Sequence, residues 1–329
     1  MSAPVATATN QIEITAANHP GDSFAEDIRD GLTRDPKVLF PKYLYDERGS
    51  ELFARICTLP EYYQTRTERK ILAEISKELI EQHQPVTLVE YGAGAATKTK
   101  ILLDAMRDAN LLHRYVPIDV SAEFLRRAAG SLAEDYPGMQ IHGLTGDFLE
   151  PIELPHSDEP RLIAFLGSTI GNLTDSEADE FFAMITDQMT PKDRFLLGID
   201  LVKDVNILER AYNDSQGVTA AFNKNILQII NRRMSADFNS DTFQHHAFYN
   251  PWEAQIEIHL ISREKQVVHI SELEMEVSFR KGESIRTEIS CKYTRERVEH
   301  LLVHAGLEPL EWFTDDREYF GLSLSRLSG

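Results

Sequence analysis

The sequence predicts an α/β fold with a doubly wound, mainly parallel sheet, joined to a second and smaller α+β unit. Three observations lead to this prediction. Short β-branched runs alternate with helix-like stretches in the middle of the chain, a glycine cluster follows the first run, and the chain ends in a helix-like stretch and two strand-like ones. Such alternation indicates right-handed βαβ units, which build parallel sheets.

The elements of the first unit can be placed in order. Strands are predicted over residues 86–91, 115–119, 139–144, 161–167 and 194–201. Helices are predicted over residues 97–109 and 121–132, and a third begins at the capping box Thr174-Asp-Ser-Glu177. A last helix over residues 294–305 and two strands over 307–314 and 319–327 complete the sheet. A terminal helix and β-hairpin on a parallel sheet resembles the methyltransferase class of doubly wound folds.

Two stretches break this alternation. Residues 24–68 are mainly helical in pattern, and residues 203–292 begin helical (206–212, 218–237) and then alternate as strands (255–262, 266–270, 273–279, 284–292). We therefore predict two domains. The first consists of residues 67–202 and 293–329, the second of residues 20–66 and 203–292, and residues 1–19 are predicted to be a flexible tail.

Composition limits the possible partners. The 329 residues allow about two domains. With 34 Lys and Arg against 53 Asp and Glu, the formal net charge is −19. Nucleic acids and anionic membranes attract basic surfaces, so this charge argues against both. No apolar run approaches the roughly 18 residues of a membrane span, and the first 20 residues lack the features of a secretory signal.

The two cysteines, Cys57 and Cys291, provide neither a disulfide framework nor a four-cysteine zinc site, and they suit a reducing cytosol. We therefore expect a cytoplasmic protein. No cluster of ligands with metal-binding spacing is evident in the sequence, so no metal is expected. Nothing marks an obligate interface, and a monomer is expected.

The glycine cluster, from Glu90 to Thr99, fits three kinds of loop. A Walker A loop and a dinucleotide fingerprint both need a glycine at position 97, where the chain has Thr. The S-adenosylmethionine loop needs an acidic residue followed by Gly-x-Gly, which Glu90, Gly92 and Gly94 supply. The third loop fits best, and the other two remain alternatives, as does an ordinary turn.

Polar residues at neighbouring strand ends strengthen the third alternative. Asp119 ends the second strand, where a carboxylate can accept from both ribose hydroxyls. Asp147 and Phe148 follow the third, where they can bind the adenine amino group and ring. Lys98 lies in the first turn of a helix, where the macrodipole disfavours a cation unless it meets an anion. A turn cap explains Asp147 and a solvated side chain explains Lys98 nearly as well.

Candidate substrate residues come from both predicted units. Gly167 and Asn172 follow the fourth strand, at the edge where open sheets bind ligands. Glu288 and Ser290 alternate along a strand and so share one face. Three tyrosines, Tyr45, Tyr62 and Tyr212, lie in the second unit or at its border, although half-buried core positions would explain them too.

Several long strings carry a resemblance that extends over residues 27–327. They are PKYLYDERGSELF, LPEYYQTRTE, FLGSTIGNLT, GIDLVKD, GVTAAFN and TEISCKY. With them the chain resembles the histidine-specific S-adenosylmethionine-dependent methyltransferases, which make hercynine for ergothioneine biosynthesis. The resemblance implies a Rossmann-like methyltransferase domain, which binds the cofactor, and a substrate-binding domain built from the N-terminal segment and the late insertion.

The resemblance also implies roles for single residues. It assigns the cofactor S-adenosylmethionine to Gly92, Lys98, Asp119, Asp147 and Phe148. It assigns the substrate L-histidine to Tyr62, Gly167, Asn172, Tyr212, Glu288 and Ser290. Asn172 and Tyr212 would hold the carboxylate and amino group, while Tyr62, Glu288 and Ser290 would face the imidazole. Tyr45 and Asn172 would orient the amine during three methyl transfers.

Two other functions remain open at this point. Relatives of the family methylate indole amino acids, and Glu288 alone cannot exclude indole because indole also has an N–H. Ile258 and His259, expected on the strand that lines the imidazole site, leave the side-chain selectivity open. A non-catalytic S-adenosylmethionine-sensing module would bind the cofactor and turn nothing over.

Overall fold

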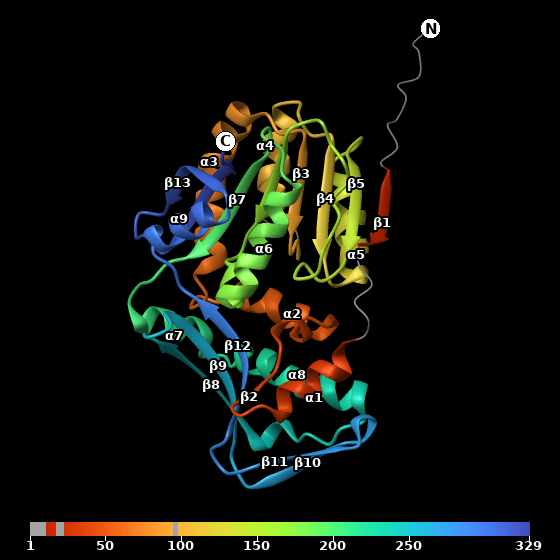
Figure 1. Ribbon diagram of the computed structural model, residues 1–329, viewed down its shortest axis with the longest axis vertical. Helices are drawn as coiled ribbons and strands as arrows, with labels where there is room; N and C mark the ends of the chain where they lie inside the picture. The colour runs from red at the N-terminus through yellow and green to blue at the C-terminus, as the bar shows by residue number, and fades with distance from the viewer. Residues whose placement is uncertain (1–10, 18–22, 95–97) are drawn as a thin grey trace.

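The computed structural model describes residues 11–17, 23–94 and 98–329 and has two lobes stacked along its long axis (Figure 1). Its α-helices are α1 (Phe24–Thr33), α2 (Glu47–Ile56), α3 (Gln64–His83), α4 (Thr99–Asp108), α5 (Ala122–Asp135), α6 (Asp175–Gln188), α7 (Val205–Tyr212), α8 (Val218–Met234) and α9 (Arg295–His304). Short 3-10 turns are η1 (Pro41–Leu44), η2 (Thr169–Asn172), η3 (Ser240–Thr242) and η4 (Ser271–Leu273). None of these helices is long and apolar enough to cross a membrane.

The upper lobe contains an eight-stranded sheet with the order β1-β5-β4-β3-β6-β7-β14-β13. Its strands are β1 (Ile12–Ala16), β3 (Thr87–Tyr91), β4 (Arg114–Asp119), β5 (Gln140–Thr145), β6 (Arg161–Phe165), β7 (Arg194–Asp200), β13 (Leu307–Thr314) and β14 (Phe320–Leu327). The first six strands in this order pair in parallel, and β14 and β13 add an antiparallel hairpin. The predicted fold, a Rossmann-like α/β sheet with a C-terminal hairpin, is confirmed.

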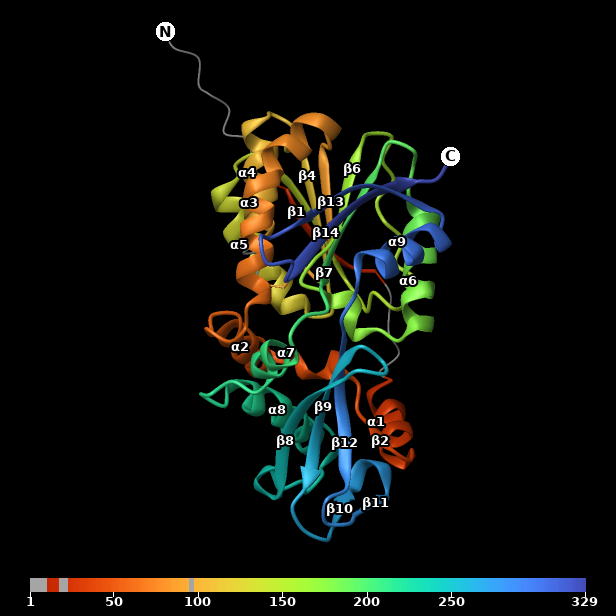
Figure 2. The same cartoon turned by 90° about the vertical axis from the view of Figure 1, so that its left-hand side faces the viewer.

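Helices cover both faces of this sheet, as Figure 2 shows, with α3, α4 and α5 on one side and α6 and α9 on the other. Successive side chains of a strand therefore pack into different hydrophobic cores, one on each face of the sheet. On β3, Leu88 packs with the first helix group and Val89 with the second. Because both faces are buried, these strands are nearly continuous apolar runs, which made them recognisable in the sequence.

Strand β1 departs from the prediction. Its residues pair in parallel with β5, with Ile12 opposite Ile141, and continue the sheet by one edge strand. The prediction of a flexible tail over residues 1–19 is therefore wrong for Ile12–Ala16. The apolar positions Ile12 and Ile14 alternate with Glu13 and Thr15, a weak strand pattern that gains stability only because β5 offers an unpaired edge. Residues 1–10 and 18–19 lie outside the described residues.

The lower lobe is built on a four-stranded sheet with the order β2-β12-β9-β8, and a separate hairpin pairs β10 with β11. The strands are β2 (Lys37–Val38), β8 (Phe243–Asn250), β9 (Gln255–Ser262), β10 (Gln266–Ile270), β11 (Met275–Phe279) and β12 (Ser284–Cys291). Its core joins buried residues from two stretches, 24–63 and 208–285. The two upper cores draw on residues 71–201 and 291–324 instead. This separation supports the predicted domain boundaries, which we keep as a proposal.

Candidate active site at the junction of the lobes

The glycine loop after β3 has the backbone geometry that its sequence suggested. Gly92 and Gly94 adopt positive φ values of 69° and 50°, which glycine tolerates best. Glu90 points inward, where Thr99 and Tyr115 donate hydrogen bonds to its Oε2 at 2.6 and 2.7 Å. Burial raises the pKa of Glu90 to about 7. Glu90 therefore anchors the loop from beneath. Positions 95–97, including Thr97, lie outside the described residues.

Asp119 lies beside this loop at the end of β4. One carboxylate oxygen accepts from the N–H of Gly94 at 3.1 Å and the other from the N–H of Ser121 at 3.0 Å. Burial raises the pKa of Asp119. The predicted residue thus stands next to the loop, at the carboxyl edge of the sheet.

The next strand end supplies Asp147 and Phe148. Asp147 accepts from the N–H of Leu149 at 3.0 Å, and its other oxygen is 3.3 Å from Nζ of Lys42, which belongs to the lower lobe. The Phe148 ring meets that of Phe165 edge-on, with ring centroids 5.4 Å apart. The structure therefore gathers the predicted cofactor residues at the ends of β3, β4 and β5.

Lys98 meets an anion, as its position suggested, but the anion in the structure is a protein side chain. Lys98 Nζ donates to Oε2 of Glu68 at 2.5 Å, and Glu68 is fully buried in α3. The other oxygen of Glu68 accepts from the N–H of Gly167 at 2.7 Å. Glu68 therefore ties the lysine expected at the cofactor to the loop expected at the substrate.

The loop after β6 brings Asn172 to the lower lobe. Gly167 has a φ of 81°, and η2 follows it directly. A Cβ on Gly171 would lie 2.8 Å from the carbonyl oxygen of Cys291, so η2 packs against β12 at backbone distance. Asn172 Nδ2 donates to Oε1 of Glu288 at 3.2 Å. The two residues predicted from different domains thus contact each other.

A bulge in β12 sets the direction of the predicted polar pair. Glu288 pairs with Ile258 and Arg286 with His259, so Thr287 is the extra residue. Paired residues share a face, and Ile258 is buried in the lower core, so Glu288 faces inward. Burial raises the pKa of Glu288 to about 7, although Asn172 opposes the shift.

His259 does not line this site. It lies on the opposite face of β9 from Ile258, and its ring stacks on Phe248 with centroids 5.6 Å apart. Its nitrogens contact Glu257 and Ser284. Alternation along a strand explains the difference, because only one of two successive residues can face the core. Ile258 and His259 both lie on β9, the strand on which they were expected, but only Ile258 faces the core.

The three predicted tyrosines converge on the inner face of β12. The rings of Tyr62 and Tyr212 meet edge-on at 6.2 Å, and the Tyr212 hydroxyl is 2.9 Å from Oγ of Ser290. Tyr45 packs edge-on against Phe53 and Phe222. Burial raises the pKa of all three hydroxyls, and the charge of Glu288 adds to this effect at Tyr45 and Tyr62. All three therefore stay protonated at neutral pH.

Sequence reasoning missed a buried charged cluster behind these tyrosines. Asp200, at the end of β7, lies 2.9 Å from Nζ of Lys292 and 2.5 Å from Nζ of Lys203. Tyr63 and Gln64 donate to the same carboxylate. Burial alone would raise the pKa of Asp200, but the two ammonium groups hold it at about 2.

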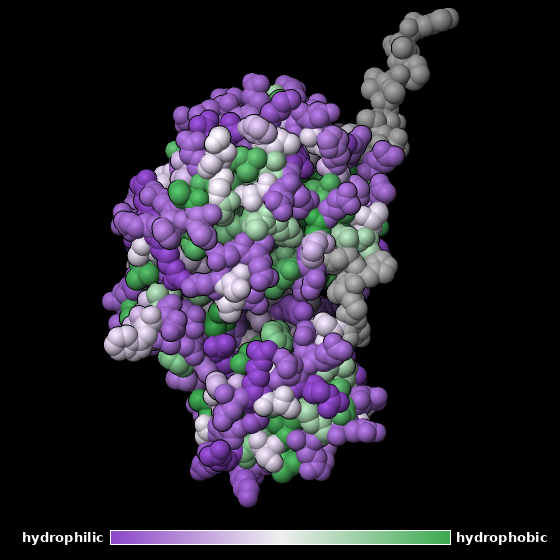
Figure 3. All heavy atoms as spheres, viewed as in Figure 1, coloured by the Kyte–Doolittle hydropathy of each residue, from purple (hydrophilic) through white to green (hydrophobic). Residues whose placement is uncertain are grey.

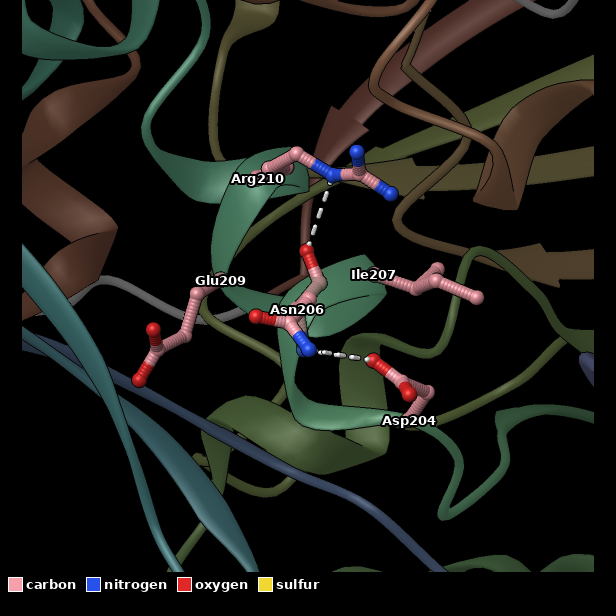
Figure 4. A pocket seen from close by; sticks show the side chains of 5 residues that line it. All are labelled: Asp204, Asn206, Ile207, Glu209 and Arg210. Atoms are coloured by element: carbon pink, nitrogen blue, oxygen red, sulfur yellow. Dashed lines mark hydrogen bonds between the residues drawn. The ribbon is translucent and has the colours of Figure 1, made fainter.

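The described surface has an open cavity of 530 Å³ at α7, which Figure 4 shows. It is lined by Asp204, Asn206, Ile207, Glu209 and Arg210, none of which was predicted in the site. We place the site elsewhere, where the predicted side chains meet. Figure 3 shows the surface indented between the lobes at this level. Among the described residues, no group of three or more His, Cys, Asp or Glu side chains could hold a metal ion.

Comparison with known proteins identifies the family. A family model described as "Histidine-specific methyltransferase, SAM-dependent" matches residues 24–327. The chain belongs to this family. A "Histidine N-alpha-methyltransferase" of Mycolicibacterium smegmatis is 49% identical over 94% of this chain and 97% of that protein. Another protein of that name, from Mycobacterium tuberculosis, is 44% identical over 95% and 99%. "Ergothioneine biosynthesis protein 1" of Neurospora crassa is 32% identical over 91% of this chain and 34% of its own length.

The residues of this histidine-specific methyltransferase family member fit S-adenosylmethionine, the methyl donor of the family. Among the described residues, none lies within 4 Å of a Cβ added at Gly92, which suits a loop whose backbone a ligand approaches closely. Lys98 carries a cation of the kind that pairs with a carboxylate, and Asp119 carries an acceptor of the kind that binds hydroxyl groups. No part of this donor set requires a metal.

Some of the missed residues did leave a signal. Glu68 falls on the buried face of α3, at helical spacing from the apolar residues Ile71 and Leu72. A charge on such a face needs a partner, and here the partners are Lys98 and Gly167. Asp200 likewise ends an apolar strand. Lys292 gave no comparable signal, because an alternating strand hides which of its residues will be fully buried.

Proposed function

We propose that the chain transfers three methyl groups from S-adenosylmethionine to the α-amino nitrogen of L-histidine, yielding hercynine in ergothioneine biosynthesis. The observation that carries the proposal is the contact of Asn172 with Glu288 at the junction of the lobes. It joins an amide suited to an amino-acid backbone with a carboxylate suited to an imidazole N–H. The names of the full-length relatives agree with this substrate.

The proposed substrate contacts follow from the site. Asn172 binds the carboxylate and amino group of histidine, next to the positive φ of Gly167 that allows close approach. Tyr212 lines the same site with its ring, because contacts with Gln64, Ser290 and Lys292 already engage its hydroxyl. Tyr62, Glu288 and Ser290 face the imidazole. Support comes from the common inward face of Glu288 and Ser290 and from the edge-on contact between Tyr62 and Tyr212.

The protein's part in the chemistry is alignment. The bound cofactor supplies an electrophilic methyl group on a sulfonium. Tyr45 stays protonated because burial raises its pKa, so it orients the amine by hydrogen bonding and does not serve as the base. A positive charge nearby favours the neutral amine, and water takes the released proton. Holding the nitrogen in line with the methyl carbon supplies the main rate gain.

We also propose that the lobes are two domains, 67–202 with 293–329 and 20–66 with 203–292, and that the protein is a cytoplasmic monomer. The separate hydrophobic cores support the first statement. The free thiols of Cys57 and Cys291 suit a reducing compartment.

Mass spectrometry of L-histidine incubated with the protein and S-adenosylmethionine tests the function. We expect products that carry one, two and three added methyl groups. If a parallel reaction methylates L-tryptophan and histidine is not methylated, the proposed substrate is wrong and the proposed methyl-transfer chemistry stands. Calorimetric binding of the cofactor with no product from either amino acid would instead favour a non-catalytic module.

A further inference from the structure

Lys292 is a fully buried cation whose hydrogen-bonding capacity is completely used. Its side chain is 0% exposed. Its Nζ is 2.9 Å from Oδ2 of Asp200 and donates to the hydroxyl oxygens of Tyr212 at 3.0 Å and Ser290 at 2.7 Å. An ammonium has three N–H donors and no acceptor. Lys292 can therefore donate hydrogen bonds to Tyr212 and Ser290 but cannot accept a hydrogen bond from either.

Gln64 supplies a second donor to the same tyrosine. Its Nε2 donates to Oδ2 of Asp200 at 2.9 Å and to the Tyr212 hydroxyl at 2.7 Å. An ionised carboxylate only accepts, so the amide nitrogen and not the amide oxygen must face Asp200. One N–H of Gln64 therefore points to Asp200, and the other points to the hydroxyl oxygen of Tyr212.

These contacts determine the direction of the remaining protons. The oxygen of Tyr212 receives hydrogen bonds from Lys292 and from Gln64, which fill its two lone pairs. It therefore cannot also accept from Ser290, and across their 2.9 Å contact Tyr212 must be the donor. Since neither Lys292 nor Tyr212 can accept it, the hydroxyl proton of Ser290 is directed toward another acceptor.

We infer that Lys292 is a positioning residue that fixes Ser290 as a hydrogen-bond donor, so that the site requires an acceptor nitrogen in the substrate ring. This inference rests on the proposed function, in which Ser290 and Glu288 face the imidazole. Glu288 then accepts from the ring N–H and Ser290 donates to the other ring nitrogen. A neutral imidazole satisfies both groups, whereas indole has one N–H and no acceptor nitrogen.

The charge state of the cluster keeps this arrangement in place. Tyr63 and Lys203 also donate to Asp200, so the carboxylate stays ionised in the interior. Burial opposes a charge on Lys292, but the carboxylate of Asp200 outweighs it and raises the pKa of Lys292. Lys292 therefore remains an ammonium at neutral pH.

The test uses ring analogues of the substrate. The two pyrrolylalanine isomers each replace one ring nitrogen of histidine by C–H, so one of them keeps the N–H that faces Glu288 and lacks the acceptor. The parent should prefer histidine over both by about tenfold or more in kcat/KM, since the Ser290 donor is left unpaired. In Lys292→Met, Ser290 can turn its proton to Tyr212, and this preference should fall to within about threefold.

Four further variants separate specificity from stability. Ser290→Ala should lose the preference to the same extent, and the double variant should lose no more, because Lys292 acts through Ser290. Lys203→Met removes a cation from Asp200 but touches neither hydroxyl, so its preference should match the parent. If Lys292→Met does not fold, Gln64→Met frees the other lone pair of Tyr212, which can then accept from Ser290, and should relax the preference alone.

An unchanged preference in a folded, cofactor-binding Lys292→Met or Gln64→Met would overturn the inference while leaving the proposed function intact. Equal loss in Lys203→Met would also overturn it, since a general weakening of the cluster would then be the cause. A parent that methylates no histidine at all would instead refute the proposed function.

Discussion

Glu288 illustrates how one residue acquires its role from its surroundings. The bulge at Thr287 turns it inward, Asn172 donates to one of its oxygens, and burial raises its pKa to about 7. A carboxylate that is only partly compensated in the unliganded site gains an additional partner when an imidazole N–H arrives. In the proposed function, recognition of the ring at the scale of single residues depends on Glu288 and on the direction of the Ser290 proton.

The substitution Glu288→Ala should lower kcat/KM for histidine by about 10- to 100-fold, because the ring N–H loses a charged acceptor. The effect should appear mainly in KM. Glu257→Ala is the matched control, since Glu257 lies on the neighbouring strand and contacts Asn250 and His259 on the outer face. Steady-state kinetics of both variants check this, and equal values for the two would mean that Glu288 does not bind the ring.

The substitution Tyr45→Phe keeps the ring packing against Phe53 and Phe222 and removes only the hydroxyl. We expect kcat to fall about tenfold in each of the three methylation steps, because the amine loses one orienting hydrogen bond. Single-turnover product analysis resolves the steps. Tyr136→Phe, which removes a hydroxyl that donates to Asp104 in the upper lobe, is the control. A Tyr45→Phe rate equal to the control's would remove Tyr45 from the mechanism.

At the scale of elements, the parts that could be predicted are those with local signals. The parallel strands are buried on both faces, and α6 begins at a complete capping box. Asp119 and Asn172 could be predicted because strand ends of a parallel sheet meet at one edge. β8 was missed because residues 243–250 contain two histidines, Gln and Asn, with no clear alternation.

Other features depend on contacts between distant segments and left no local pattern. The bulge at Thr287 exists only relative to the partner strand β9, so β12 alone does not reveal it. Lys292 and Asp200 are 92 positions apart in the sequence and meet only because β12 reaches the end of β7. Their pairing follows from packing between lobes, which the pattern of a single element does not encode.

The turn η2 should be sensitive to a single methyl group. In Gly171→Ala the added Cβ would lie 2.8 Å from the Cys291 carbonyl oxygen, so η2 must move away from β12. Because Asn172 lies on η2, we expect KM for histidine to rise at least tenfold while cofactor affinity changes less. Calorimetry with each ligand separates the two. Gly130→Ala in α5, where an added Cβ would meet nothing within 4 Å among the described residues, is the control, and equal losses for both ligands would contradict the prediction.

The anchor of the glycine loop should give stability a dependence on pH. The pKa of Glu90 is about 7 in the folded protein and 4.5 in an ordinary environment. The folded state therefore holds a proton that the unfolded state releases between these values. The stabilisation is fully present below pH 4.5 and is lost as the pH rises through 7.

Glu90→Gln cannot ionise, so its Tm should decline less than that of the parent between pH 4.5 and about 7. Glu288 shifts in the same direction and leaves a residual slope in the variant. Thermal unfolding across this range measures the difference, and Glu74→Gln, on the exposed face of α3, changes the net charge by the same amount. Parallel Tm curves for parent and Glu90→Gln would show that Glu90 is not the titrating group.

At the scale of the whole molecule, the proposed site lies where the lobes meet. Asn172 and Gly167 come from the upper lobe, and Tyr45, Tyr62 and Glu288 from the lower one. The lobes also share charges. Lys42 of η1 lies 3.3 Å from Asp147, the residue expected at the adenine, and 3.1 Å from Asp27. Burial opposes the charge of Lys42, but the two carboxylates outweigh it and raise the pKa of Lys42.

The ion pair of Lys42 with Asp147 should help hold the lobes together over the bound ligands. A partly exposed pair contributes about 0.2–1 kcal/mol, which corresponds to a change of about 1.4- to fivefold in affinity. We therefore expect Lys42→Met to raise KM for histidine by that factor at low salt. Because salt screens the pair in the parent, KM of the parent should rise with ionic strength toward the value of the variant, whose own KM should stay nearly constant.

Lys100→Met is the matched control for this last prediction. Lys100 pairs with Asp135 inside the upper lobe. The substitution therefore removes the same charge as Lys42→Met without affecting a contact with the lower lobe. Its KM should follow the parent at every salt concentration. If Lys100→Met behaves like Lys42→Met, net charge and not the contact between lobes governs histidine affinity. If Lys42→Met matches the parent throughout, the lobes are held by the packing of η2 on β12 and by the buried Asp200–Lys292 pair, without help from Lys42.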